Sequence, residues 1–473
     1  MYRSYSELKS NLSTNKISVL QVVAHYVSQI EKNKHLNAFL EVFEDDALNR
    51  AREIDKKISQ NKAGKLAGMV IGIKDNLCYK GHKVSAASKI LEGFESLYTA
   101  TAVQRLLDED AIIIGRLNCD EFAMGSSNEN SAFGKVLNPI NNKLVPGGSS
   151  GGSAAAVKAG LCMAALGSDT GGSIRQPASF CDIVGLKPSY GRISRYGLIA
   201  YASSFDQIGP LTNTIEDAAL ILQIMAGKDE MDSTSSSKPI DDYLSFEKKK
   251  NKIAIFSSFI SHSGIDHEVK NGINSILSKL EAQGHEVEAV DFPYLDYLVP
   301  TYYVLTTAEA SSNLARYDGI HYGYRSENTV DMETTYKKSR TEGFGEEVKR
   351  RIMLGTFVLS SGYYDAYYSK AQKVRRLLKN TMDELFEKFD HIVIPTSPHT
   401  PFQIGQQVDD PIKMYLEDIF TVLANLSGNP AISLPVGKHS SGLPFGLQII
   451  SKNFCEREML SFSKEIMDNF SRN

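Results

Sequence analysis

Residues 146–176 read PGGSSGGSAAAVKAGLCMAALGSDTGGSIRQ, and Gly-Gly-Ser occurs three times in this stretch. A flexible glycine-serine linker would have nothing packed beside it. Here residues 154–160, AAAVKAG, are typical of a helix, and residues 161–167, LCMAALG, are typical of a buried strand. The sequence therefore predicts two ordered glycine-rich turns, one before the helix and one after the strand, rather than a hinge.

Two other uses of glycine-rich turns fit this stretch poorly. It contains neither the Gly-Lys-Ser/Thr ending of a phosphate-binding loop nor the Gly-x-Gly-x-x-Gly pattern of a dinucleotide site. Residues 147–151 match Gly-x-Ser-x-Gly, the nucleophile elbow of α/β-hydrolases, which needs a strand directly before it. The preceding residues 138–146, NPINNKLVP, are rich in proline and asparagine and do not predict a strand.

The composition is that of an ordinary globular protein. Of 473 residues, 42% are hydrophobic and 23% are charged. The net charge of -4 argues against a surface built mainly to bind nucleic acid, and no apolar run approaches the roughly 18 residues that span a bilayer. The five cysteines include no Cys-x-x-Cys pair and no apolar leader follows Met1, so we expect free thiols and a cytoplasmic location.

Strand and helix patterns alternate along the chain, which predicts an α/β fold. A helical segment is expected over about 1–60, where Ser18 and Gln21 have capping-box spacing. Further strands are expected at 69–73, 111–115, 253–256, 286–290, 391–395 and 446–450, with helices at 101–108 and 266–282. The polar segment at about 230–241 is expected to be an exposed connection. No long linker divides the chain, so residues 1–473 are interpreted as one domain.

Three positions could form a nucleophilic centre: Lys74 at the end of the strand at 69–73, Ser149 on the first turn and Ser173 on the second. A serine is a poor nucleophile until a base removes its proton, and a buried lysine can act as that base because burial lowers its pKa. Taken alone, however, the local sequence around Lys74 favours a lysine that reaches water from the strand end.

The combined pattern decides between these interpretations. GIKDN at 72–76, PGGSSGGS at 146–153 and GSDTGGSIRQP at 167–177 together resemble the amidase signature family. This resemblance implies a large mixed β-sheet covered by helices on both faces. It also implies a Ser-Ser-Lys triad in which Ser173 is the nucleophile, Ser149 is a bridging serine in a cis conformation and Lys74 is the base.

The same resemblance implies an oxyanion hole at the second turn. The backbone N–H groups of Thr170, Gly171 and Gly172 would stabilise the negative charge of a tetrahedral intermediate. Asp169 and Arg175 flank the nucleophile, and we expect them to form a supporting ion pair rather than to contact substrate.

Other stretches narrow the resemblance to the A subunits of aspartyl/glutamyl-tRNA amidotransferases. They are DEFAMGSSNENS at 120–131, EASSNLARYDG at 309–319, EVKRRIMLGTF at 347–357, DIFT at 418–421 and LSGNPA at 426–431. The implied activity is glutamine hydrolysis. Arg351 and Asp418 match the positions that hold the two charged ends of glutamine, with Tyr302 beside them, although the adjacent Arg350 leaves the register open by one residue.

The resemblance also implies partners. The A subunits of this family work in a heterotrimer. Its B subunit binds ATP and Mg²⁺ and activates the amino acid on the misacylated tRNA, and its small C subunit wraps around the other two. This chain itself is expected to bind no cofactor and no metal. The acceptor, Glu-tRNA(Gln), Asp-tRNA(Asn) or both, is left open by the sequence. The alternative function is a stand-alone amidase that acts on a small or lipid amide. A non-catalytic scaffold is disfavoured because Lys74, Ser149 and Ser173 are all present.

Overall fold

The computed structural model describes residues 2–406, 414 and 417–470, and its core is one sheet of eleven strands. The strands are β1 (Phe39–Val42), β2 (Val70–Lys74), β3 (Ile112–Leu117), β4 (Ala164–Asp169), β5 (Val184–Lys187), β6 (Gln207–Thr212), β7 (Lys252–Phe256), β8 (Glu286–Val290), β9 (His391–Pro395), β10 (Ala431–Lys438) and β11 (Pro444–Ser451). They lie in the order β1-β3-β2-β4-β6-β5-β10-β11-β9-β7-β8. β2 pairs in parallel with β3 and β4, whereas β10 and β11 are antiparallel, so the expected mixed sheet is confirmed.

Helices surround this sheet. The described α-helices are α1 (Tyr5–Ser13), α2 (Val19–Lys32), α3 (Glu44–Ser59), α4 (Thr101–Asp108), α5 (Gly151–Lys158), α6 (Arg175–Phe180), α7 (Ile215–Met225), α8 (Ser257–Ile260), α9 (His267–Ala282), α10 (Leu295–Asn313), α11 (Met332–Gly343), α12 (Glu346–Leu359), α13 (Lys370–Leu385), α15 (Val422–Ser427) and α16 (Glu456–Phe470). Short 3-10 turns are η1 (Lys34–Leu36), η2 (Lys89–Leu91), η3 (Glu121–Ala123) and η4 (Leu314–Arg316), and η5 (Asp365–Ser369) is a π-helical turn.

The core has two large hydrophobic clusters, because successive side chains of a strand point to opposite faces of the sheet. Ile253, Val393 and Ile432 belong to one cluster together with residues of α2, α3, α7, α9 and α16. Ala254 and Ile392 belong to the other, which includes residues of α10, α12 and α13. Helices therefore cover both faces of the sheet, as expected.

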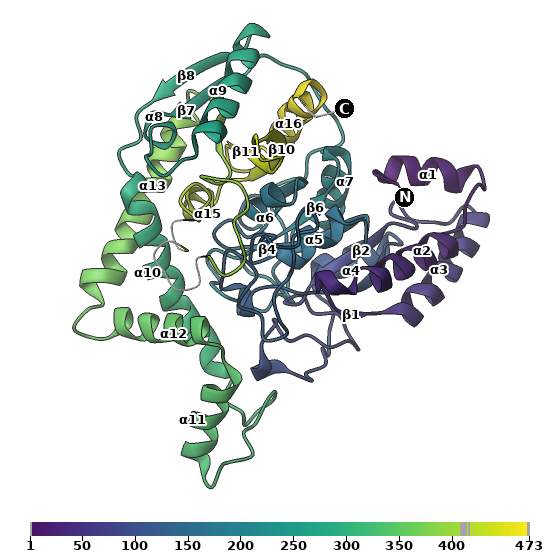
Figure 1. The fold of residues 1–473 in the computed structure, drawn as a ribbon, viewed down its shortest axis with the longest axis vertical. Coiled ribbons are helices and arrows are strands. Elements are labelled where there is room, and N and C mark those ends of the chain that lie inside the picture. The colour runs from purple at the N-terminus through teal and green to yellow at the C-terminus, as the bar shows by residue number, and fades with distance from the viewer. Residues whose placement is uncertain (1, 407–413, 415–416, 471–473) are drawn as a thin grey trace.

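The unit formed by β7, α9 and β8 extends the same sheet. β7 pairs in parallel with both β8 and β9, so the strands at 253–256 and 286–290 continue the sheet at its far end from β1. The sequence pattern located these strands but did not predict β1, β5, β6 or β10. α11 projects away from the sheet at the lower end of the molecule (Figure 1).

The N-terminal segment contains α1, α2, α3 and the edge strand β1. Ser18 and Gln21 form the expected capping box at the start of α2. Residues 230–241 contain neither helix nor strand and are mostly exposed. Among the described residues, no helix is both long and apolar enough to cross a membrane.

Candidate active site

Lys74 is the last residue of β2 and is fully buried. Its Nζ lies 2.6 Å from Ser149 Oγ, 3.0 Å from Ser150 Oγ and 2.9 Å from Ser168 Oγ. Ser168 belongs to β4, the strand next to β2, and the other two serines belong to the first glycine-rich turn. The local expectation of a solvent-exposed lysine is wrong because the neighbouring strand and the turn enclose the amine.

Three serine hydroxyls surround the Lys74 amine. Burial lowers the pKa of Lys74, and a neutral amine has two N–H donors and one lone pair. The Ser150 hydroxyl donates to the backbone oxygen of Ser168, and Ser168 Oγ accepts from Asn76 Nδ2. Both hydroxyl oxygens can therefore accept the two N–H groups of Lys74. The Lys74 amine donates to Ser149 Oγ at the shortest of the three distances, and in its neutral form it would direct its lone pair to this hydroxyl.

The first glycine-rich turn presents Ser149 to this lysine. The Gly148–Ser149 peptide bond is cis, as the resemblance implied. A Cβ on Gly148 would lie 2.2 Å from Oδ2 of Asp120, so the turn needs glycine here. Residues 138–146 form turns and an isolated bridge instead of a strand, which excludes the strand-to-helix elbow of α/β-hydrolases.

The second turn lies between β4 and α6 and carries Ser173. The Ser150 N–H group donates to the backbone oxygen of Ser173 at 3.2 Å, which joins the two turns. Ser173 is 8% exposed, whereas Lys74 and Ser149 are 0% exposed. The structure thus brings the three residues into one buried cluster, with Ser173 as the member that solvent can reach.

An ion pair supports the second turn. Arg175 Nη2 lies 2.9 Å from Asp169 Oδ1, and both side chains are fully buried, so the expected pair is confirmed. Burial by itself would raise the pKa of Asp169, but the Arg175 guanidinium lowers it to about 2. Asp169 also accepts the N–H groups of Gly172 at 2.9 Å and Ile174 at 3.2 Å. Its carboxylate therefore holds the backbone on both sides of Ser173.

Gly171 and Gly172 are packed between α10 and the start of α15. A Cβ on Gly171 would lie 2.5 Å from the Tyr302 hydroxyl, and one on Gly172, whose φ is +133°, would lie 2.2 Å from Thr421 Oγ1. The Thr421 hydroxyl also donates to the backbone oxygen of Gly171. Tyr302 is buried and stands directly beside the turn from which the resemblance implies oxyanion donors.

The two arginines of α12 differ in exposure. The Arg351 side chain is 3% exposed, and that of Arg350 is 43% exposed. Arg351 Nε donates to Glu347 at 2.8 Å, and its Nη1 donates to the Tyr201 hydroxyl at 2.8 Å. Its guanidinium also faces the ring of Tyr303 at 5.1 Å. Arg351 is therefore the arginine that points into the protein.

Asp418 completes the charged part of the site. It accepts hydrogen bonds from the Ser126 hydroxyl and the Tyr303 hydroxyl, each at 3.0 Å. Burial raises the pKa of Asp418 to about 7, while the Tyr303 hydrogen bond and the charge of Arg351 act in the opposite direction. Sequence reasoning missed Tyr303, which stands next to Tyr302, and Ser126, which lies within DEFAMGSSNENS.

The described residues contain no group of three or more His, Cys, Asp or Glu side chains placed to hold a metal ion. All five cysteines are free, as expected from their spacing.

Comparisons with known proteins agree with this geometry. The amidase family model matches residues 21–460. The glutamyl-tRNA(Gln) amidotransferase A chain of Chlorobium limicola is 53% identical over 468 residues, which is 98% of each chain. The solved structure of its counterpart from Thermotoga maritima is 41% identical, has a TM-score of 0.80 and covers 97% of this chain and 96% of its own. A peptide amidase of Stenotrophomonas maltophilia is 25% identical, has a TM-score of 0.82 and matches 98% and 96% of the two chains. This chain belongs to the amidase family.

Proposed function

We propose that this chain is the glutamine-hydrolysing A subunit of a tRNA-dependent amidotransferase. The ammonia that it releases converts misacylated Glu-tRNA(Gln) to Gln-tRNA(Gln), with Asp-tRNA(Asn) as a second candidate acceptor. Support comes from full-length similarity to glutamyl-tRNA(Gln) amidotransferase A subunits. The observation that carries the proposal is the buried Lys74–Ser149 hydrogen bond beside Ser173. We place the reaction in the cytoplasm.

In this proposal the triad moves one proton in a relay. Lys74, as a neutral amine, accepts the proton of Ser149, and Ser149 accepts that of Ser173 as its Oγ attacks the side-chain amide carbon of glutamine. The resulting tetrahedral intermediate collapses when the relay returns the proton to the amide nitrogen, so ammonia leaves and Ser173 carries a γ-glutamyl ester. Water, activated by the same relay, then hydrolyses the ester to glutamate and restores Ser173.

The oxyanion of that intermediate would lie at the second turn. We assign its stabilisation to the N–H groups of Thr170, Gly171 and Gly172, where each lost donor typically costs about 3–4 kcal/mol. In the present structure the Gly172 N–H group donates to Asp169. Oxyanion binding at Gly172 would therefore share a donor that already orders the turn.

Free glutamine needs a partner for each charged end. We assign the α-carboxylate to Arg351 and the α-ammonium to Asp418, whose carboxylate is already held by Tyr303 and Ser126. In this assignment Tyr302, which lies beside Gly171, forms the wall of the glutamine site next to the reacting carbonyl.

Replacing Arg351 with alanine is expected to raise the KM for glutamine by about 30-fold or more and to change kcat less. Truncating one partner of a buried charge pair costs about 2–5 kcal/mol. Arg350→Ala is the matched control, because Arg350 shares Glu347 as a partner but is half-exposed. Steady-state glutaminase assays of both variants measure the difference. A KM increase in Arg350→Ala alone would move the assignment by one residue.

Glutamine affinity is also expected to fall below pH 7. The Asp418 pKa is raised to about 7, so acid converts the carboxylate to a neutral acid that cannot pair with the α-ammonium group. Each pH unit below that pKa should weaken binding about tenfold. Calorimetric titration of glutamine into a Ser173→Ala variant isolates binding from catalysis. Asp418→Asn should bind weakly at every pH, and a pH-independent affinity in the Ser173→Ala protein would contradict the assignment.

The other steps of the reaction need partner chains. We propose a heterotrimer in which the B subunit binds ATP, Mg²⁺ and the misacylated tRNA, and the C subunit contacts both larger chains. A candidate contact surface on this chain is formed by the exposed side chains of α12, of η5 and of the turn between them, namely Met353, Phe357, Tyr363 and Tyr367. The rings of Phe357 and Tyr363 are 4.3 Å apart, so these side chains form one patch.

Reconstitution tests the proposed function. The purified chain should hydrolyse glutamine weakly at most and should not amidate Glu-tRNA(Gln). Adding cognate B and C chains with ATP and Mg²⁺ should produce Gln-tRNA(Gln) in a glutamine-dependent reaction. A lone chain that rapidly hydrolyses small or lipid amides and is unaffected by those partners would instead be a stand-alone amidase.

A further inference from the structure

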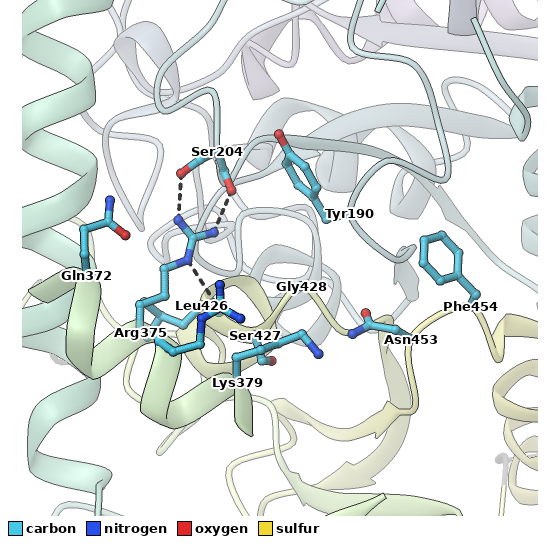
Figure 2. Close-up of a pocket in the computed structure, with 11 residues that line it drawn as sticks. Tyr190, Ser204, Gln372, Arg375, Lys379, Leu426, Ser427, Gly428, Asn453 and Phe454 are labelled. Atoms are coloured by element: carbon cyan, nitrogen blue, oxygen red, sulfur yellow. Dashed lines mark hydrogen bonds between the residues drawn. The ribbon is translucent and has the colours of Figure 1, made fainter. Parts of the chain in front are cut away.

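A surface pocket of about 620 Å³ lies between α13, the C-terminal end of α15 and the loop that follows β11 (Figure 2). We call it the α13 pocket, because Gln372, Arg375, Arg376 and Lys379 of this helix line it. These residues follow one another at intervals of three, one and three, which places their side chains on one face of the helix. Its volume lies within the range of about 300–1,000 Å³ that is typical of small-molecule sites.

The pocket is cationic. Its lining residues include three basic side chains and no carboxylate. Arg375 donates to the backbone oxygen of Leu426 at 3.1 Å, to Ser204 Oγ at 2.7 Å and to the backbone oxygen of Ser204 at 2.8 Å. All three acceptors are neutral, so they satisfy its N–H groups without neutralising its charge. Burial lowers the pKa of Arg375, which is the direction expected for such a cation, although the charge of Glu309 opposes it.

The other two cations face solvent. Arg376 is exposed and has no ion-pair or hydrogen-bond partner among the described residues. Lys379 pairs with Asp383 one turn along the helix, with side-chain exposures of 33% and 54%. Exposed pairs of this kind contribute little to stability, so an incoming anion can compete for the lysine.

Aromatic rings and a side-chain amide line the opposite side of the pocket. Tyr190, Phe454 and Asn453 lie across from Arg375 (Figure 2). Such rings bind flat heterocycles by stacking, and the Asn453 amide can form hydrogen bonds with polar groups at the edge of the heterocycle. Lys238 and Arg192 lie 4.5 Å and 4.7 Å from the centroid of the Phe454 ring. Arg195 lies 5.3 Å from that of the Tyr190 ring, so this side also carries positive charge.

The α13 pocket is separate from the candidate active site. Thr421, directly before α15, donates a hydrogen bond to Gly171 of the second glycine-rich turn. The pocket is lined by the other end of α15, at Leu426, Ser427 and Gly428. A structural role accounts for Arg375, which donates to the backbone oxygen of Leu426 near the end of α15. It does not explain Arg376 or Lys379, which hold no other element in place.

We propose that the α13 pocket binds a nucleotide unit, with its phosphate at Arg376 and Lys379 and its base against Tyr190 and Phe454. The unit belongs either to a free nucleotide or to an RNA chain, because both present a phosphate beside a flat base. This site goes beyond the proposed glutaminase reaction and does not depend on it.

Calorimetric titrations of the full chain at low salt test the proposal. The probes are AMP, adenosine, inorganic phosphate and a 5′-phosphorylated RNA trinucleotide. AMP or the RNA should bind, and both adenosine and phosphate should bind at least about tenfold more weakly. Binding of the RNA alone, or of AMP alone, identifies the source of the nucleotide.

Charge-reversal variants locate the binding. Arg376→Glu with Lys379→Glu should weaken binding of the preferred probe by about tenfold or more, since two charge-assisted phosphate contacts are replaced by repulsion. Lys373→Glu is the matched control, because Lys373 is an exposed lysine of the same helix that does not line the pocket. Absence of AMP and RNA binding at millimolar concentration overturns the proposal. So does equal binding to the double variant, or phosphate binding as tight as that of AMP.

Discussion

Replacing Ser173 with alanine is expected to abolish glutamine hydrolysis by the assembled enzyme. Without the hydroxyl no γ-glutamyl ester forms, and loss of a serine nucleophile typically lowers kcat by about 10⁶-fold. Release of ammonia and of glutamate, measured in the presence of the B and C chains, gives the rate.

Ser179→Ala is the matched control for this change. Ser179 is a buried serine in α6, and its hydroxyl has no hydrogen-bond partner among the described residues. Its removal should leave glutaminase activity unchanged. If Ser173→Ala still releases glutamate at a rate close to that of Ser179→Ala, another residue attacks the amide.

Lys74→Ala and Ser149→Ala should each lower kcat by about 10²–10⁴-fold, because each breaks the proton relay to Ser173. The two residues act as one unit through their 2.6 Å hydrogen bond, so the double variant should be scarcely slower than either single variant. KM for glutamine should change little, since neither residue is assigned to its charged ends.

A second replacement separates catalysis from stability. Lys74→Met keeps most of the side-chain volume and removes a buried amine, so the protein should remain folded by circular dichroism while activity is lost. Multiplicative losses in the Lys74→Ala, Ser149→Ala double variant would show that the two side chains act independently, contrary to the relay.

The fold was predictable where the pattern is local. The strands at 69–73 and 111–115 and the helix at 101–108 are apolar runs or periodic segments bounded by turn residues, and the structure has β2, β3 and α4 there. β5, β6 and β10 were not predicted. β5 pairs antiparallel with β6, the next strand along the chain, and β10 forms a hairpin with β11. The sheet is joined between these pairs by β10 and β5, which lie more than 240 residues apart in the chain. Such pairing leaves little local signal, because it is stabilised by tertiary contacts.

The candidate active site likewise combines residues that local motifs predict with contacts between residues far apart in the chain. The local sequence around Lys74 predicted a lysine that reaches solvent. Only the three motifs taken together predicted that Lys74 is the base of a catalytic triad. Ser126 binds Asp418 across 292 residues, and Tyr303 does so across 115. The choice between adjacent residues, Tyr302 or Tyr303, depends on the rotation of α10. A helix that is buried on most sides gives no periodic pattern to fix that rotation.

The most direct test of the account is to identify the acylated residue. The assembled enzyme is mixed with glutamine, quenched in acid within its first turnovers, digested and analysed by mass spectrometry. The account predicts a γ-glutamyl group on the peptide that contains Ser173, and its absence in Ser173→Ala. A γ-glutamyl group on any other residue, or on the Ser173→Ala protein, would contradict it.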